Sequence, residues 1–280
     1  MRITMIGHST VLLEAAGMTL VTDPYFGTFG HLAYSRLRPP ARGREDLRAV
    51  DGVLLSHAHW DHTDGRYLRA LDPAIPVIAP TWTSAVMKLK GARNVVPMAP
   101  WQSRTIGSAV VTAVPATHIA RTIGYMIELG GVCAYFAGDT YHRPFMAEIG
   151  RRFDIDVAMM PVTAFLIPLT MGERGAVEAV RDLLPAAVIP IHEGIRPRSP
   201  LLRGGESVEG FEGRLVAAGL KTEVVHLREG EHWDSASESA ADPERMALPR
   251  NRGLAGSPRS ADLADSRFPP ADASVRPVAP

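Results

Sequence analysis

The stretch Ser56-His57-Ala58-His59-Trp60-Asp61-His62 decides what kind of protein this chain can be. It places three imidazoles and a carboxylate directly after an apolar, strand-like segment, and zinc and similar divalent metals prefer these side chains as ligands. On an extended segment His57 and His59 point to the same side, so both can reach one ion. Asp61 and His62 follow one turn later and can reach a second ion. The stretch therefore predicts a metal site at a strand end rather than a solvated, histidine-rich loop.

Three further ligand-type side chains come at the ends of later strand-like segments. His118 follows the run 110–117, Asp139 follows Phe136-Ala137-Gly138, and His192 follows Val188-Ile189-Pro190-Ile191. Each residue alone is compatible with a structural role. Rigid elements are good supports for metal ligands, however, and the same placement recurs three times. Together with the first stretch, these residues predict one metal centre built from several strands.

Strand-like and helix-like segments alternate along most of the chain, which is typical of an α/β protein. Strands are expected at 2–8, 10–15, 18–22, 52–56, 94–98, 109–114, 123–129, 132–137, 155–160, 187–191 and 223–227, and helices at 81–90, 173–184 and 208–220. Gly130-Gly131 predicts a hairpin turn between two of these strands. The irregular stretch 23–46 is rich in Gly, Pro and Arg, and such long loops often line a functional surface.

The composition changes near residue 234 and divides the chain into two parts. Residues 1–234 are expected to form one domain. Residues 235–280 are rich in Pro, Ala and Ser and have no sustained apolar period. Because such a segment cannot bury enough apolar surface to offset its ordering entropy, it is predicted to be a disordered tail.

Composition also limits the partners and the compartment. The 280 residues contain 30 basic and 30 acidic side chains, so no net charge attracts nucleic acid. The single cysteine, Cys133, fits a reducing compartment. The chain shows neither a secretory signal at its start nor an apolar run of about 18 residues. A cytoplasmic protein without a transmembrane segment is therefore expected, and its oligomeric state is not predicted.

These motifs resemble those of a known family. His57-Ala58-His59-Trp60-Asp61-His62 is similar to the metal-binding signature of the metallo-β-lactamase superfamily, and Gly138-Asp139-Thr140 looks like its bridging-aspartate motif. Gly7-His8-Ser9-Thr10, Thr22-Asp23-Pro24 and Leu169-Thr170-Met171-Gly172 resemble one branch of metal-dependent hydrolases. That branch includes YtkL-like proteins, ascorbate-6-phosphate lactonase and N-acyl-phosphatidylethanolamine phospholipase D. The resemblance extends over about residues 2–232.

The resemblance implies a fold and a set of ligand roles. The fold would be a four-layer αβ/βα sandwich, with two mixed sheets packed face to face and helices outside. One metal ion would be held by His57, His59 and His118, and a second by Asp61, His62 and His192. Asp139 would bridge both ions. Asp23 would lie behind the ligands and accept hydrogen bonds from the metal loop. The metals are expected to be two Zn²⁺ ions, with Mn²⁺ or Fe²⁺ as alternatives.

The predicted function is metal-dependent hydrolysis by a hydroxide that bridges the two ions. Asp61 and Asp139 would fix the ions and accept the proton. His142, three residues after Asp139, is a candidate for protonating the leaving group, and His8 is expected to lie behind the ligands. The scissile bond would be a phosphodiester, a lactone or an ester.

The substrate itself is not predicted beyond a small or lipid-like molecule. Tyr25, Phe26, Phe29 and the run 165–169 could form an apolar wall, and Arg196 and Arg198 could bind a phosphate, but core packing and an exposed surface explain these residues equally well. A nuclease of the same superfamily is the alternative function, although no nucleic-acid partner is expected from the neutral charge. Iron-based oxygen chemistry and binding without catalysis are further alternatives.

Overall fold

Two seven-stranded β-sheets and five α-helices form most of the computed structural model, which describes residues 1–27 and 32–235. In spatial order the first sheet contains β16 (His232–Asp234), β1 (Arg2–Gly7), β2 (Thr10–Ala15), β3 (Met18–Thr22), β5 (Gly52–Leu54), β6 (Val77–Pro80) and β7 (Val95–Met98). The second contains β15 (Glu223–Val224), β13 (Ala187–Ile191), β12 (Val157–Pro161), β11 (Val132–Phe136), β10 (Ile123–Leu129), β9 (Ala109–Pro115) and β8 (Ser103–Ile106).

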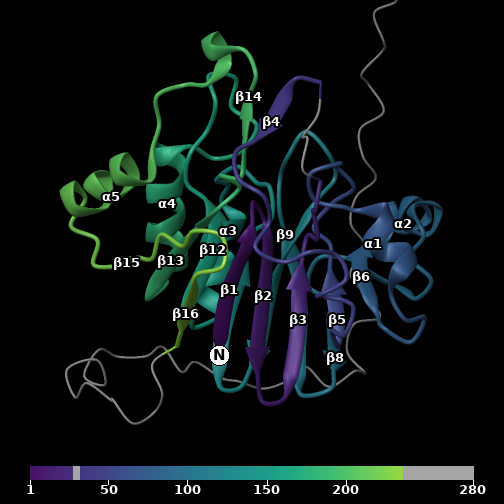
Figure 1. Cartoon of the computed structure of the whole chain (residues 1–280). Coiled ribbons are helices and arrows are strands. Elements are labelled where there is room, and N and C mark those ends of the chain that lie inside the picture. Colours follow the sequence, from purple (N-terminus) through teal and green to yellow (C-terminus); the bar gives the residue numbers. More distant parts are fainter. Residues whose placement is uncertain (28–31, 236–280) are drawn as a thin grey trace, which may run out of the picture. The chain divides into compact units, whose positions relative to one another are not determined.

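The helices and a small ribbon complete the described part. The helices are α1 (Gly65–Ala70), α2 (Ser84–Lys90), α3 (Phe145–Arg152), α4 (Glu173–Leu183) and α5 (Val208–Ala217), with short 3₁₀ turns η1 (Thr81–Thr83) and η2 (Pro200–Leu202). Strand β4 (Tyr34–Arg36) pairs antiparallel with β14 (Ile195–Pro197). In Figure 1, α1 and α2 lie on one side of the molecule and α4 and α5 on the other.

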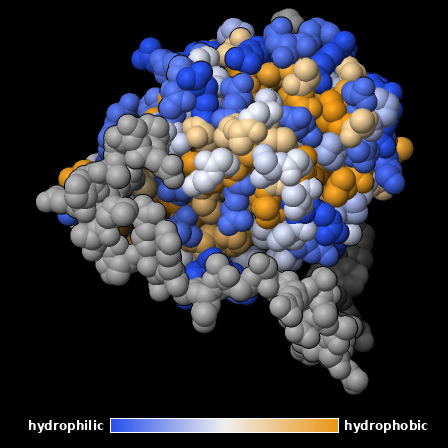
Figure 2. All heavy atoms as spheres, turned by 90° about the horizontal axis from the view of Figure 1, so that it is seen from below, coloured by the Kyte–Doolittle hydropathy of each residue, from blue (hydrophilic) through white to orange (hydrophobic). Residues whose placement is uncertain are grey.

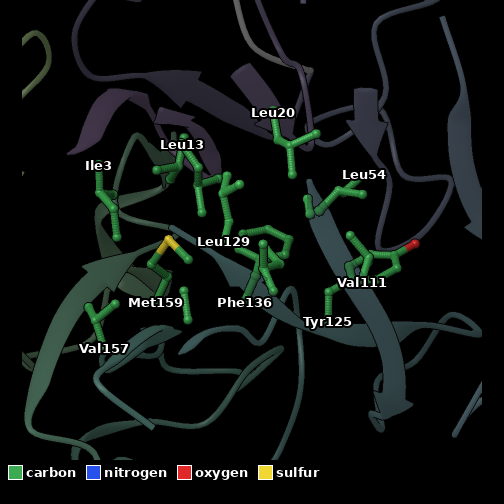
Figure 3. Close-up of a cluster of buried hydrophobic side chains, with 14 of the residues drawn as sticks. Ile3, Leu13, Leu20, Leu54, Val111, Tyr125, Leu129, Phe136, Val157 and Met159 are labelled. Carbon is green, nitrogen blue, oxygen red and sulfur yellow. The ribbon is translucent and has the colours of Figure 1, made fainter. Parts of the chain in front are cut away.

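Alternation along the strands sorts side chains into layers, because successive residues of a strand face opposite sides of the sheet. On β11, Ala134 and Phe136 join the apolar cluster between the two sheets, whereas Tyr135 joins the cluster that contains residues of α3, α4 and α5. On β2, Leu13 faces the inner cluster and Leu12 packs with residues of α1 and α2. Figure 3 shows the inner cluster, with side chains of both sheets pointing toward one another. The four-layer αβ/βα sandwich is therefore confirmed.

Strand direction brings several loops to one edge of the sandwich. In the first sheet β1, β2 and β3 are antiparallel neighbours, and β5 runs parallel to β3, so β1, β3 and β5 share one direction. In the second sheet β9, β11, β12 and β13 share one direction for the same reason. Strand β1 starts at the labelled N-terminus at the lower end of Figure 1 and runs upward. Figure 2 views the molecule from that lower end, where hydrophilic and hydrophobic residues are interspersed.

Most predicted elements are present, with shorter or shifted ends. The hairpin at Gly130-Gly131 joins β10 to β11, and both glycines have positive φ, 60° and 77°. The helix predicted at 81–90 begins as the 3₁₀ turn η1, and the strand predicted at 223–227 keeps only Glu223–Val224. The sequence analysis missed α1, α3, β4, β6, β8, β14 and β16. These elements have three to eight residues, too few for a helical or strand period to stand out.

Two further expectations concern the ends of the chain and membranes. The predicted tail, residues 235–280, lies outside the described residues except for Ser235. Within the described residues, no helix is both long and apolar enough to cross a membrane.

Candidate metal centre

The predicted ligands lie in the loops that follow parallel strands at the shared edge. The loop 55–64 follows β5, His118 follows β9, Asp139 follows β11 and His192 follows β13. Asp23 follows β3 and His8 follows β1. His8, Asp23 and His192 have positive φ values of 63°, 33° and 70°, a region that residues with side chains rarely adopt. Such backbone strain is concentrated at functional sites in proteins.

The structure brings the predicted ligands together in two groups. In each group the potential ligand atoms lie within 4.8 Å of one another. The first group consists of His57, His59, His118 and Asp139. The second consists of His8, Asp61, His62 and His192. All seven predicted ligands are therefore gathered at one place, in the expected division, and His8 joins the second group.

The Asp139 carboxylate lies between the two groups. Its Oδ2 is 3.6 Å from His118 Nε2 and 3.9 Å from His57 Nε2, both in the first group. The same oxygen is 3.2 Å from His192 Nε2, and Oδ1 is 3.3 Å from His62 Nε2, both in the second group. One buried carboxylate thus contacts imidazoles of both groups.

Hydrogen bonds orient three of the imidazoles from behind. His118 Nδ1 donates to the Leu169 carbonyl oxygen at 2.7 Å. His62 Nδ1 donates to Asp23 Oδ2, also at 2.7 Å. His57 Nδ1 is 2.9 Å from Ser56 Oγ, whose own proton is directed to Asp23 Oδ2 at 2.5 Å, so the imidazole is the donor there. In the neutral form of each ring Nδ1 carries the proton, so Nε2 presents its lone pair to the site, which is the arrangement common in metal-ligating histidines.

Asp23 links this loop to β3. Its Oδ1 accepts the Ser56 backbone N–H at 2.7 Å, while Oδ2 accepts from Ser56 Oγ and His62 Nδ1. The side chain is fully buried. Burial raises the pKa of the carboxyl group, and the hydrogen bonds from His62 and Ser56 oppose that shift. Both oxygens of Asp23 therefore accept hydrogen bonds from the loop after β5.

The charge states suit metal binding in the first group. Burial, followed by the neighbouring His62, lowers the pKa of His57 well below its ordinary value. Burial also lowers the pKa of His59 and His118. Burial alone would raise the pKa of Asp139, but His192 and His62 hold it well below its ordinary value. Neutral imidazoles and an ionised carboxylate are the forms that a divalent metal binds.

Several buried polar atoms at this place lack a hydrogen-bond partner among residues 1–27 and 32–235. His57 Nε2, His62 Nε2 and Asp139 Oδ1 are among them, and all three face the two groups. Unsatisfied buried polar atoms are costly, so a native protein leaves them where a ligand or ion will complete them. A set of imidazole nitrogens and carboxylate oxygens fits zinc, manganese or iron. The residues therefore fit divalent metal binding.

The remaining candidates lie apart from the two groups. His142 Nε2 is paired with Asp182 Oδ2 at 2.8 Å, and the structure does not bring it into either group. Glu193, which follows His192, pairs with His226 at 3.0 Å. Arg196 is exposed on β14. The geometry gives none of these residues a direct role in the metal site.

Aromatic side chains extend from the metal loop toward the β4–β14 ribbon. The ring of Trp60, which lies between two predicted ligands in sequence, is 5.5 Å from Tyr25 and 6.3 Å from Tyr34, measured between centroids. Tyr34 in turn lies 5.9 Å from Phe165. Two members of the predicted apolar wall, Tyr25 and Phe165, are thus beside the site, and Phe29 lies outside the described residues. Trp60 and Tyr34 were missed, although Trp60 lies within the signature itself.

A cavity of about 430 Å³ borders the loop between β9 and β10. Trp82, Ile119 and Arg121 are among its lining residues, together with His118. The His118 side chain is only 1% exposed, however, so this cavity does not open onto its ring. Access to the metal groups is therefore not provided through this cavity.

Comparisons with known proteins identify the family and agree with the fold. A family model described as "Beta-lactamase superfamily domain" matches residues 18–192. A protein of Pyrobaculum calidifontis called "UPF0173 metal-dependent hydrolase" is 31% identical over 82% of this chain and 98% of its own length. Among solved structures, Igni18, a metallo hydrolase of Ignicoccus hospitalis, has a TM-score of 0.68 at 22% identity, covering 84% of this chain and 99% of its own. An isothiocyanate hydrolase from Delia radicum gut bacteria has a TM-score of 0.70 at 18% identity, covering 85% and 100%.

Proposed function

Because the chain belongs to the β-lactamase superfamily and is a metal-dependent hydrolase, we propose that it works with two divalent metal ions at the centre described above. His57, His59 and His118 would hold the first ion, and Asp61, His62 and His192 the second. Asp139 would bridge them. Zinc is the metal that this donor set favours first.

The position of Asp139 is the observation that carries this proposal. Its two oxygens lie 3.2 to 3.9 Å from Nε2 atoms of both groups. A site for one ion would need only one of the two groups, and the second would then be a cluster of buried imidazoles without a purpose. Burying polar groups in that way is unfavourable unless a ligand completes them. A shared carboxylate between two complete ligand groups supports two ions.

The chemistry follows from the donor set. When bound, the two divalent ions would lower the pKa of a water molecule toward neutrality and stabilise the negative charge of the transition state. Asp61 and Asp139 are the carboxylates near enough to accept a proton there. His142 is not included, because its Nε2 is held by Asp182.

The bond cleaved is proposed to be a phosphodiester, a lactone or an ester. The aromatic series Trp60, Tyr34 and Phe165 beside the metal loop supports a substrate with an apolar part. Such a surface would accommodate a lipid-like or other small amphiphilic molecule better than a nucleic-acid backbone. The net charge of zero also argues against a polyanionic substrate.

Asp139→Ala tests the proposal directly. We expect the metal-loaded variant to keep its fold but to lose more than about 100-fold in turnover, because changes to residues that only orient metal ligands already cost about 10–100-fold. Turnover is measured on a chromogenic phosphodiester, a lactone and a simple ester, and metal content by elemental analysis. Circular dichroism checks the fold.

Asp154→Ala is the matched control, since Asp154 is an exposed carboxylate beyond α3. It should keep the metal content and the turnover of the native protein. Full activity of Asp139→Ala at unchanged metal content would refute the bridging role. A native protein that binds one ion per chain at saturation would refute the dinuclear centre.

A further inference from the structure

His8 lies inside the second group, although its place after the first strand suggested only a supporting position. Its side chain is fully buried, and Nε2 has no hydrogen-bond partner among the described residues. Nε2 lies 3.4 Å from Asp61 Oδ2. By distance alone, His8 could therefore be a fourth ligand for the second ion, alongside Asp61, His62 and His192.

The loop after β13 determines which nitrogen of His8 carries the proton. The backbone N–H of Gly194 donates to His8 Nδ1 at 3.2 Å. An N–H donor needs a lone pair on its acceptor, so Nδ1 is unprotonated. A neutral imidazole carries its single proton on the other nitrogen. Nε2 of His8 is therefore an N–H donor, and it faces Asp61.

The other imidazoles have the opposite arrangement. His62 and His118 donate through Nδ1 to Asp23 and to the Leu169 carbonyl, so their Nε2 atoms present lone pairs. A metal ion binds a lone pair and cannot bind a nitrogen that carries a proton. The hydrogen bond from Gly194 thus gives His8 a different role from His62 in the same group.

Glycine at 194 makes this hydrogen bond geometrically available. A Cβ atom at that position would lie 2.8 Å from both Cβ and N of His8, closer than such atoms approach in proteins. A second bond, from the His192 N–H to the His8 carbonyl oxygen at 3.2 Å, joins the same two loops. The close approach of these loops therefore depends on the absence of a side chain at 194.

We infer that His8 is a positioning residue of the second metal site: its protonated Nε2, 3.4 Å from Asp61 Oδ2, would donate to that carboxylate in the metal-loaded protein, and His8 does not bind the metal. The inference rests on the proposed dinuclear centre. The acceptor, Asp61 Oδ2, also lies 3.9 Å from Nε2 of His62 and of His192. A carboxylate oxygen has two lone pairs, so it can accept from His8 and still bind an ion. His8 would thereby hold Asp61 in the orientation that the second site needs.

Nuclear magnetic resonance of the full-length, ¹⁵N-labelled protein loaded with ¹¹³Cd²⁺ separates the two roles. We expect coupling between ¹¹³Cd and ring nitrogens of His62 and His192. For His8 we expect a directly bonded proton on Nε2 and no coupling to ¹¹³Cd. The spectrum of His8→Gln identifies the His8 signals by their loss. Coupling between ¹¹³Cd and either nitrogen of His8 would overturn the inference.

Metal affinity gives a second readout. His8→Phe keeps a ring but removes the N–H donor. It should weaken Cd²⁺ binding at the second site about 10–100-fold and leave Cd²⁺ binding at the first site unchanged. His8→Gln can place an amide N–H near the position of Nε2, so it should restore most of that affinity. His232→Gln, at an exposed histidine of β16, is the matched control and should bind both equivalents as the native protein does.

The outcomes distinguish this inference from the proposed function. Unchanged binding by His8→Phe, or equal losses of both equivalents by His8→Phe and His8→Gln, would show that His8 does not act through a hydrogen bond to Asp61. If His8→Phe fails to fold, the comparison of His8→Gln with the native protein and the ¹¹³Cd couplings still decide. Binding of only one equivalent by the native protein would refute the dinuclear centre, and this inference with it.

Discussion

Asp23 shows at the scale of a single residue how a buried carboxylate supports the metal loop without facing the ions. It receives three hydrogen bonds, from the Ser56 N–H, from Ser56 Oγ and from His62 Nδ1. All three donors belong to the loop after β5. An ionised carboxylate is the one side chain of this size whose two oxygens both accept.

Asp23→Asn replaces one acceptor oxygen by an NH₂ group, which would face a donor of Ser56 or His62. We expect the free energy of unfolding of the metal-free protein to fall by about 1–3 kcal/mol, the cost of a buried donor without a partner. Because His62 loses its fixed orientation, metal affinity should fall about 10–100-fold. Urea unfolding and competition with a chromophoric chelator measure the two effects.

Asp51→Asn is the control for this substitution. Asp51 is exposed and accepts the Thr19 N–H through one oxygen at 2.7 Å, which the amide oxygen of asparagine can replace. The unfolding free energy of Asp51→Asn should stay within about 0.5 kcal/mol of that of the native protein. If Asp23→Asn has the same stability and the same metal affinity as the native protein, the role assigned to Asp23 is contradicted.

At the scale of elements, helix α1 follows directly after the metal loop, and its first turn is capped by Asp64, the last residue of that loop. Asp64 is its N-cap, and its Oδ1 accepts from the backbone N–H groups of Arg66 and Tyr67. The helix has six residues, too few to be stable alone. Arg44, in the long loop before β5, binds the other carboxylate oxygen at 2.6 Å. The end of the metal loop is thus held by one capping residue and its ion pair.

Asp64→Ala removes both interactions and should lower the free energy of unfolding by about 1–2 kcal/mol. Asp64→Ser keeps a capping oxygen and loses only the ion pair with Arg44. Its free energy of unfolding should therefore lie between those of Asp64→Ala and the native protein. Urea titrations of the three proteins at one pH measure the differences. Equal stability of Asp64→Ala and the native protein would show that the cap is not needed.

Lowering the pH should reduce the difference in unfolding free energy between the native protein and Asp64→Ser. Burial alone would raise the pKa of Asp64, but hydrogen bonds from Arg44 and from the Tyr67 N–H hold it below its ordinary value. Such a group stabilises the fold above its unfolded pKa of about 3.9, and the contribution is lost as the pH falls through the folded pKa. The gap between the native protein and Asp64→Ser should therefore be constant above about pH 5 and shrink below pH 4.

At the scale of the whole molecule, the two ends of the described domain are joined at one sheet edge. Strand β16 pairs with β1, with Arg2 opposite Asp234, and these side chains form an ion pair at 2.9 Å. The N-terminal amino group donates to Ser235 Oγ at 2.7 Å. Trp233 packs against the inner core. Contacts with the first strand therefore continue through Ser235, the last residue of the described range.

Two truncations test the boundary predicted near residue 234. Removal of residues 236–280 should leave the free energy of unfolding within about 0.5 kcal/mol of the full chain, if the tail is disordered as its composition predicts. Removal from Glu231 onward deletes β16 and should cost about 2–4 kcal/mol, because several backbone hydrogen bonds and the Trp233 contact are lost. Thermal and urea unfolding compare the three chains. A large loss on the shorter truncation would contradict the predicted tail.

Most long, strongly patterned segments were predictable from the sequence, and several short ones were not. The strands β1, β2 and β3 and the helix α4 have a clear period of two or of 3.6 residues in their sequences. Helix α1 and the edge strands β8 and β16 have no such period. Their structure depends on an N-cap, on a sheet edge already in place and on contacts with residues far away along the chain.

The sequence by itself determined the donor set and its place at strand ends, because residue type sets metal preference and apolar runs reveal strands. Only the tertiary structure decided how these donors are grouped, that Asp139 contacts both groups, and that His142 pairs with Asp182 instead. It also decided the proton position on His8, through a hydrogen bond from Gly194, 186 residues away. Distances and tautomers depend on which loops the fold brings together, and no local pattern encodes them.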